Sequence, residues 1–145
     1  MEDLRTVQML LGGPRAIGGE LRTPLDLVDR VREGLLPITI ENLATKLDMK
    51  ADELGAVAGV PVRTRHRRKT ANERLKPSES EGVLRIARIA GRACVVLGDL
   101  EAAHQWLRTP VPALGGVTPL SLLDTEPGAA LVSDALGRLE YGVFS

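Results

Sequence analysis

From residue 23 onward, apolar residues recur every three or four positions, a spacing that is typical of amphipathic helices. Thr23 and Pro24 have the features of a helix start, and glycine or proline interrupts the pattern further along. The pattern predicts helices that begin near residues 24, 39, 52, 61, 78, 99, 118 and 127. Residues 1–22 contain two glycine pairs and no sustained period, which predicts at most one short helix and a mobile loop.

The longest apolar run follows Ser78 and Glu81, two residues that have the spacing of a capping box, and it ends at Leu97. Its only polar stripe consists of Arg85, Arg88 and Arg92. A helix with this pattern is buried on most sides, so we expect the spine of a C-terminal module or a dimer contact. Because a small monomer covers such a helix poorly, we predict a homodimer.

Composition supports an all-α fold of one or two small domains. The 145 residues are 43% hydrophobic and only 2% aromatic, so the core consists of aliphatic side chains that favour packed helices. Cys94 is the only cysteine and the chain has two histidines, which leaves too few ligands for a tetrahedral zinc site and excludes an intrachain disulfide. We expect no metal or other cofactor.

Two further features indicate a cytoplasmic protein without a membrane partner. No stretch reaches the length of about 18 apolar residues that a membrane span requires. The first residues are acidic and lack the basic and apolar pattern of a signal peptide.

The zero net charge conceals a strongly basic segment. Residues 61–76 contain seven basic and one acidic side chain, a net of +6, whereas residues 1–60 and 77–145 each have a net of −3. Such a local excess of positive charge indicates an anionic partner.

The basic segment follows a helix-turn-helix pattern. Gly55 and Gly59 have the spacing of a close helix–helix approach followed by a turn, and Pro61 opens the arginine-rich helix after it. In such a motif the second helix lies in the major groove of DNA. We therefore predict that this helix binds DNA through Arg63, Thr64, Arg65, His66, Arg67, Arg68 and Lys69. A solvated helix face, a linker or a docking patch for an acidic protein are the alternatives.

No set of residues has the pattern of a catalytic site. The chain lacks a Gly-x-Ser-x-Gly motif, and its glycine pairs are not followed by the lysine of a phosphate-binding loop. No nucleophile, base and orienting group stand at suitable spacings, so we expect no catalytic residue and no enzymatic activity.

The C-terminal third contains four distinctive stretches: residues 102–107 (an Ala-x-x-x-Trp-Leu pattern), residues 114–123, Gly128 with Val132, and residues 136–143. In these stretches it resembles the Xre/ParS-like antitoxins that pair with RES-domain toxins. The N-terminal half is similar to the Xre-like helix-turn-helix of that family, with Arg63-Thr64 and Arg67-Arg68 in its recognition helix. Val111 departs from the family pattern, in which Asn is common at this position.

This resemblance implies a non-enzymatic antitoxin that binds and silences a NAD-consuming RES-domain toxin and represses its own operon by binding operator DNA. Two of the three aromatic residues lie in the last five positions, where a partner protein is needed to cover them. We therefore predict that the toxin is contacted by Arg138, Tyr141, Gly142, Val143, Phe144 and Ser145.

The residues alone leave other interpretations open. A stand-alone dimeric helix-turn-helix transcription regulator or a nucleoid-type DNA-binding protein also fits the basic helix. Trp106 is expected to anchor the core of the C-terminal module, and Phe144 has the alternative of folding back onto it. The predicted organisation is a mobile segment (1–22), a helix-turn-helix module (23–76) and a toxin-binding module (77–145).

Overall fold

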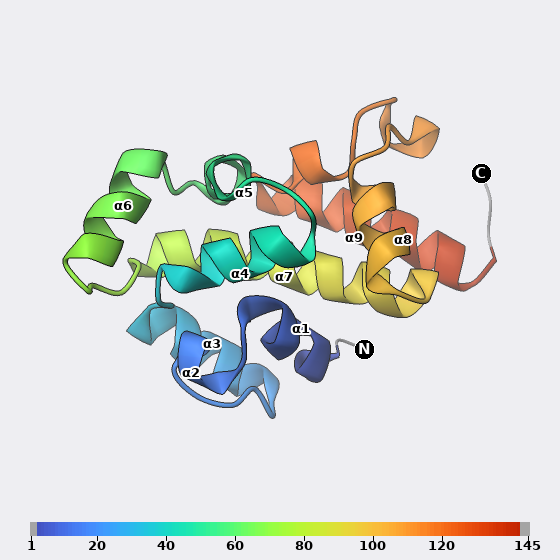
Figure 1. The fold of residues 1–145 in the computed structure, drawn as a ribbon. Helices are drawn as coiled ribbons and strands as arrows, with labels where there is room; N and C mark the ends of the chain where they lie inside the picture. The colour runs from blue at the N-terminus through green and yellow to red at the C-terminus, as the bar shows by residue number, and fades with distance from the viewer. Residues whose placement is uncertain (1–2, 143–145) are drawn as a thin grey trace.

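The computed structural model describes residues 3–142, and these form an all-α fold (Figure 1). The helices are α1 (Leu4–Leu11), α2 (Pro14–Ile17), α3 (Pro24–Glu33), α4 (Ile38–Lys46), α5 (Ala51–Ala58), α6 (Val62–Thr70), α7 (Pro77–Leu97), α8 (Leu100–Leu107), the short 3₁₀ helices η1 (Pro112–Leu114) and η2 (Leu120–Leu122), and α9 (Glu126–Glu140). Within the described residues there is no strand, only an isolated antiparallel bridge between Val111 and Val117. The all-α prediction is confirmed.

Helix α7 is the axis of the molecule. Helices α1, α3 and α5 pack on it from the N-terminal part of the chain, and α8 and α9 pack on it from the C-terminal part (Figure 1). With 21 residues and a rise of 1.5 Å per residue, it is about 31 Å long. The two predicted modules therefore share one helix and one hydrophobic core.

The burial of α7 corrects the argument for a homodimer. Ten of its residues are buried within the single chain: Ser80, Gly82, Val83, Leu84, Ile86, Ala87, Ile89, Ala90, Gly91 and Ala93. The chain covers this helix without a second copy, because helices from both halves pack around it. The apolar pattern of α7 is thus no reason to expect a dimer.

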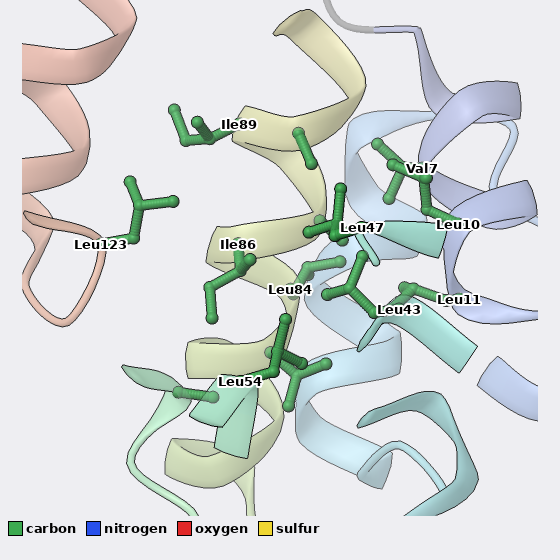
Figure 2. Close-up of a cluster of buried hydrophobic side chains, with 14 of the residues drawn as sticks. Val7, Leu10, Leu11, Leu43, Leu47, Leu54, Leu84, Ile86, Ile89 and Leu123 are labelled. Atoms are coloured by element: carbon green, nitrogen blue, oxygen red, sulfur yellow. The ribbon is translucent and has the colours of Figure 1, made fainter. Parts of the chain in front are cut away.

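Residues 4–17 differ from the sequence expectation of one short helix and a loop. They form two helices, α1 and α2, and the side chains of Val7, Leu10 and Leu11 are buried against α4 and α7. Figure 2 shows these side chains converging with Leu43 and Leu47 beside α7. The 7, 10, 11 spacing is that of one helix face, a signal that the flanking glycines obscure.

The start of α7 also differs from the prediction. The helix begins at Pro77, and the Glu79 carboxylate accepts a hydrogen bond from the Lys76 backbone N–H at 2.8 Å. The predicted capping pair of Ser78 and Glu81 is therefore wrong by two positions, because Lys76 and Glu79 form the observed pair. Ser80 is instead buried, and its Oγ accepts a hydrogen bond from the Leu35 backbone N–H.

Helix α9 runs parallel to α7, so the C-terminal ends of the two helices lie on the same side of the molecule (Figure 1). Arg85 pairs with Glu126 at the start of α9, at 2.9 Å, and Arg92, two turns later, donates to Ser133. Figure 1 shows α6 beyond the first turn of α7 and the end of α9 beside its last turn. Among the described helices, none is both long enough and apolar enough to span a membrane.

Candidate DNA-binding and partner-binding surfaces

The connection from α5 to α6 has the geometry of a helix-turn-helix. A Cβ atom at Gly55 would lie 2.8 Å from the Val60 carbonyl oxygen, so only glycine allows this approach. Gly59 has a φ of +82° and ends α5 in the left-handed conformation. Both glycines thus have the roles that their spacing predicts, and they set the angle at which α6 leaves α5.

Helix α6 has an exposed face and a buried face. Arg63, His66 and Arg67 are exposed, and their spacing of three and four residues places them on one side of the helix. Thr64 is half-buried at the edge of this side. The structure therefore brings four of the seven predicted DNA-binding residues to the outer side of α6 or to its edge.

Arg65 lies on the buried face of α6. Its guanidinium pairs with the Glu41 carboxylate of α4 at 3.1 Å and with Asp52 in the first turn of α5. The Arg65 side chain is only 8% exposed. Lys69, one turn further along and exposed, reaches the same Glu41 carboxylate at 3.0 Å.

Arg68 is the second buried arginine of α6. It pairs with Glu79 in the first turn of α7 and with Glu73 in the connection between α6 and α7, both at 3.1 Å. Its side chain is 10% exposed. Neither Arg65 nor Arg68 lies on the exposed side of α6, although sequence analysis grouped both with the exposed arginines.

The carboxylates that hold these arginines were missed by sequence analysis. Glu41, Asp52 and Glu79 lie 24, 13 and 11 residues from their partners along the chain. Local spacing gives no signal for pairs at such separations, because an i,i+3 or i,i+4 relation applies only within one helix. The helical period of α6 is the one sequence signal that separates the buried arginines from the exposed ones, because it places Arg65 and Arg68 on the side opposite Arg63 and Arg67.

The end of α9 forms the second surface. Tyr141 is 80% exposed, and Gly142 has a φ of +69°. Arg138 is half-buried and lines a cavity of about 360 Å³, whose other lining residues are Arg92, Ser133, Asp134, Gly137 and Tyr141. Val143, Phe144 and Ser145, also predicted to contact a toxin, lie outside the described residues, as does the alternative contact of Phe144 with Trp106.

Polar contacts position the base of this cavity. The Arg92 Nη1 atom donates to Ser133 Oγ at 2.5 Å, and Nη2 lies 3.7 Å from Glu140. Gly137 allows the arginine to lie against α9, since a Cβ there would be 3.1 Å from Arg92 Nη2. The cavity therefore joins α7 and α9 and opens beside the exposed Tyr141 ring.

The remaining candidate residues have structural environments. Trp106 is partly buried and packs against the hydrophobic core. His104 Nε2 lies 2.9 Å from the Glu101 carboxylate within α8. Burial raises the pKa of the Cys94 thiol, which disfavours the reactive thiolate. Among residues 3–142, no three His, Cys, Asp or Glu side chains gather in a way that could hold a metal ion.

The fold and these surfaces define a class of protein, a helix-turn-helix module joined through a shared helix to a second helical module. The family profile of the antitoxin Xre-like helix-turn-helix domain matches residues 26–88. The profile of the antitoxin Xre/MbcA/ParS C-terminal toxin-binding domain matches residues 92–142. The first match ends and the second begins within α7, whereas the boundary predicted from the sequence between the two modules lies before that helix.

Similar proteins can be aligned with this sequence over nearly its whole length. An antitoxin Xre of Yersinia enterocolitica is 37% identical over 136 residues, which cover 90% of this chain and 92% of that protein. An antitoxin Xre of Photorhabdus laumondii is 31% identical and covers 93% of this chain and 88% of its own length. A Prs ADP-ribosylating antitoxin of a Sphingobium species is 28% identical, covering 85% of this chain and 83% of its own. The chain belongs to the Xre family of antitoxins.

Proposed function

We propose that this antitoxin binds and neutralises a RES-domain toxin that consumes NAD, and that it represses its own operon by binding operator DNA in the cytoplasm. The observation that carries the proposal is the position of two exposed surfaces, the outer face of α6 and the end of α9, at opposite ends of α7. At such a separation, DNA and toxin bind without competing for the same residues. The proposed role is that of a binding protein and includes no catalytic step.

The outer face of α6 supports the DNA-binding part. Arg63, His66 and Arg67 lie on the exposed side of the second helix of the motif, where major-groove contacts are made. Arginines at such positions contact phosphates or guanine edges, and Thr64 at the edge can contact either a phosphate or a base. Lys69 is exposed, but its ammonium group pairs with Glu41, which reduces its availability for phosphate.

The end of α9 supports the toxin-binding part. An exposed tyrosine beside a cavity is a typical anchor of a protein interface, and Arg138 adds a charged donor at its rim. The family profile of the toxin-binding domain extends to residue 142, so it includes this end. The name of the Sphingobium relative refers to ADP-ribosylation, a reaction that consumes NAD, which supports a NAD-consuming partner.

Homodimerisation remains part of the proposal on one argument only. Helix-turn-helix proteins usually read two half-sites about 34 Å apart with two copies of the motif. Light scattering of the purified antitoxin at micromolar concentration tests this point directly, and a monomer would contradict it.

Two variants separate the two binding activities. The double substitution Arg63→Ala and Arg67→Ala is expected to weaken binding to a promoter fragment from upstream of the antitoxin gene, and to leave toxin binding intact. Deletion of residues 141–145 is expected to do the reverse. The double substitution Arg5→Ala and Arg15→Ala removes the same charge from exposed positions on α1 and α2, and serves as the control for charge alone.

The toxin is tested by co-expression with the protein encoded beside the antitoxin. Co-purification, together with recovery of cellular NAD when the antitoxin is present, is the expected result. If the neighbouring protein does not bind but the promoter fragment does, the alternative of a stand-alone dimeric regulator is correct. If the folded 141–145 deletion still neutralises the toxin, the toxin contact lies elsewhere.

A further inference from the structure

Helix α6 is attached to the molecule differently from the other helices. Its only buried side chains are Arg65 and Arg68, and Val62 is 41% exposed. Each of the other α-helices between residues 3 and 142 buries at least one apolar side chain. Val60 and Leu75 are buried on either side of α6 and hold its ends, but apolar packing does not determine how the helix is rotated about its axis.

Two of the four carboxylates provide the main attachment. The side chains of Glu79 and Glu41 are 12% and 24% exposed, whereas those of Glu73 and Asp52 are 57% and 60% exposed. Ion pairs shielded from water hold their geometry more strongly than exposed ones, which solvent and salt weaken. The pairs Arg68–Glu79 and Arg65–Glu41 are therefore the two that matter most.

These two pairs connect α6 to two different helices. Glu41 lies in α4 and Glu79 in the first turn of α7, and the arginines that reach them are three residues apart on one face of α6. Attachment at two points from two directions determines the rotation of the helix. The rotation in turn determines that Arg63 and Arg67 point outward.

From this arrangement we propose that Arg65 and Arg68 are positioning residues, which orient α6 through Glu41 and Glu79 and make no contact with DNA. The inference rests on the proposed DNA binding by the outer face of α6. The proposal divides the basic segment into an exposed set of side chains that contacts phosphates and bases, and a buried set that forms ion pairs within the protein.

The proposal predicts an effect opposite to that of simple electrostatics. Removing a negative charge near a DNA-binding helix strengthens binding if charge alone acts, because the surface becomes more positive. Glu79→Gln keeps an acceptor for the Lys76 N–H and removes the charge that holds Arg68. We expect this variant to bind the promoter fragment more weakly, by roughly tenfold, a change typical of coupling between neighbouring groups.

Glu81→Gln is the matched control for that variant. Glu81 is exposed, lies in the same helix two residues further along, and forms no described pair with α6. It loses the same charge, and its affinity is expected to stay the same or to rise slightly. If Glu79→Gln binds as tightly as Glu81→Gln, the positioning role is wrong.

The salt dependence of binding distinguishes positioning from contact. Each phosphate contact contributes about −0.9 to the slope of log K against log salt concentration. Arg67→Ala is expected to reduce the steepness by about that amount. Arg65→Met, which leaves Glu41 paired with Lys69, is expected to lower affinity with the slope unchanged. A loss of slope in Arg65→Met equal to that in Arg67→Ala would overturn the proposal.

Hydrogen exchange tests the attachment without DNA. Amides of α6 are expected to exchange faster in Glu79→Gln than in the native chain or Glu81→Gln, while amides of α9 remain equally protected. Unchanged protection of α6 would overturn the role of Glu79. A different outcome is faster exchange of α6 in Glu79→Gln together with no DNA binding by the native chain. In that case the proposed DNA binding is wrong and so is the positioning role, but the attachment of α6 by ion pairs is supported.

Discussion

Helix α6 and the C-terminal end of α9 are at opposite ends of the molecule (Figure 1), and the two helices are attached in different ways. Helix α9 buries an uncharged, mostly apolar face against α7 and η2, made of Gly128, Ala129, Val132, Ala135 and Leu136. Helix α6 buries two arginines and no apolar side chain. The first attachment provides stability, because burial of apolar surface is favourable wherever it occurs. The second provides orientation, because an ion pair depends on the position of both partners.

This difference suits the two proposed tasks. A helix that reads DNA needs its outer face at a defined angle, and a charged inner face defines that angle without requiring a large core. The C-terminal module needs a firm support for an exposed end, and α9 obtains it from a face in which Val132 and Leu136 are both fully buried. Stability and orientation are therefore separable by mutation.

The largest expected effect is at the apolar attachment of α9. Leu136 is 0% exposed, so Leu136→Ala leaves a cavity and is expected to lower the free energy of unfolding by about 3 kcal/mol. Denaturant unfolding followed by circular dichroism measures this change. Leu131→Ala, in the same helix at a residue that is 53% exposed, is the control and is expected to change stability by less than about 0.5 kcal/mol. Equal effects of the two substitutions would contradict the role of the buried face.

A smaller effect on stability is expected when both members of the Arg65–Glu41 ion pair on the buried side of α6 are replaced. The double variant Arg65→Met and Glu41→Leu exchanges a shielded ion pair for apolar contacts, and is expected to change the free energy of unfolding by no more than about 1 kcal/mol. The single variant Arg65→Ala, which loses packing as well as charge, is the comparison. A loss by the double variant as large as that of Leu136→Ala would show that α6 and α9 are not attached differently.

A still smaller effect is expected for the ion pair that joins the two modules directly. Glu53 in α5 and Arg108 after α8 are 3.1 Å apart, and both side chains are more than one-third exposed. Solvent weakens such pairs, so a double-mutant cycle with Glu53→Gln and Arg108→Met is expected to give a coupling of a few tenths of a kcal/mol. A coupling above about 1 kcal/mol would indicate a stronger direct connection between the modules.

The smallest effect concerns the first turn of α3. Backbone N–H groups of Thr23 and Arg22 donate to the Asp26 carboxylate and lower its pKa below the ordinary value of 3.8. A carboxyl group with a lowered folded-state pKa contributes stability above its unfolded pKa, and loses it as the pH falls through the folded pKa. Asp26→Asn is therefore expected to lower Tm slightly at pH 7. The difference should shrink as the pH falls below 3.8 and vanish once the pH is below the lowered folded-state pKa, and a difference that persists there would have another cause.

Much of the fold follows from local sequence signals. The cap at Thr23, the cap at Asp99 and the close approach at Gly55 depend on residues within a few positions, and each is present in the structure. The buried face of α1 was missed because the glycines that follow it suggested a loop. The cap of α7 lies two residues before the predicted one, because Ser78 and Glu81 have the same spacing as the pair that Lys76 and Glu79 form.

The sequence by itself determined that the chain is helical, that α5 and α6 form a helix-turn-helix, and that positive charge is concentrated in α6 and its flanks. These are properties of neighbouring residues, for which helical period, capping and turn chemistry suffice. Only the tertiary structure decided which of those charges remain available. Folding brings Glu41 and Glu79 from the acidic flanks onto Arg65 and Arg68, because burying a guanidinium requires an opposite charge beside it, and that partner can come from anywhere in the chain.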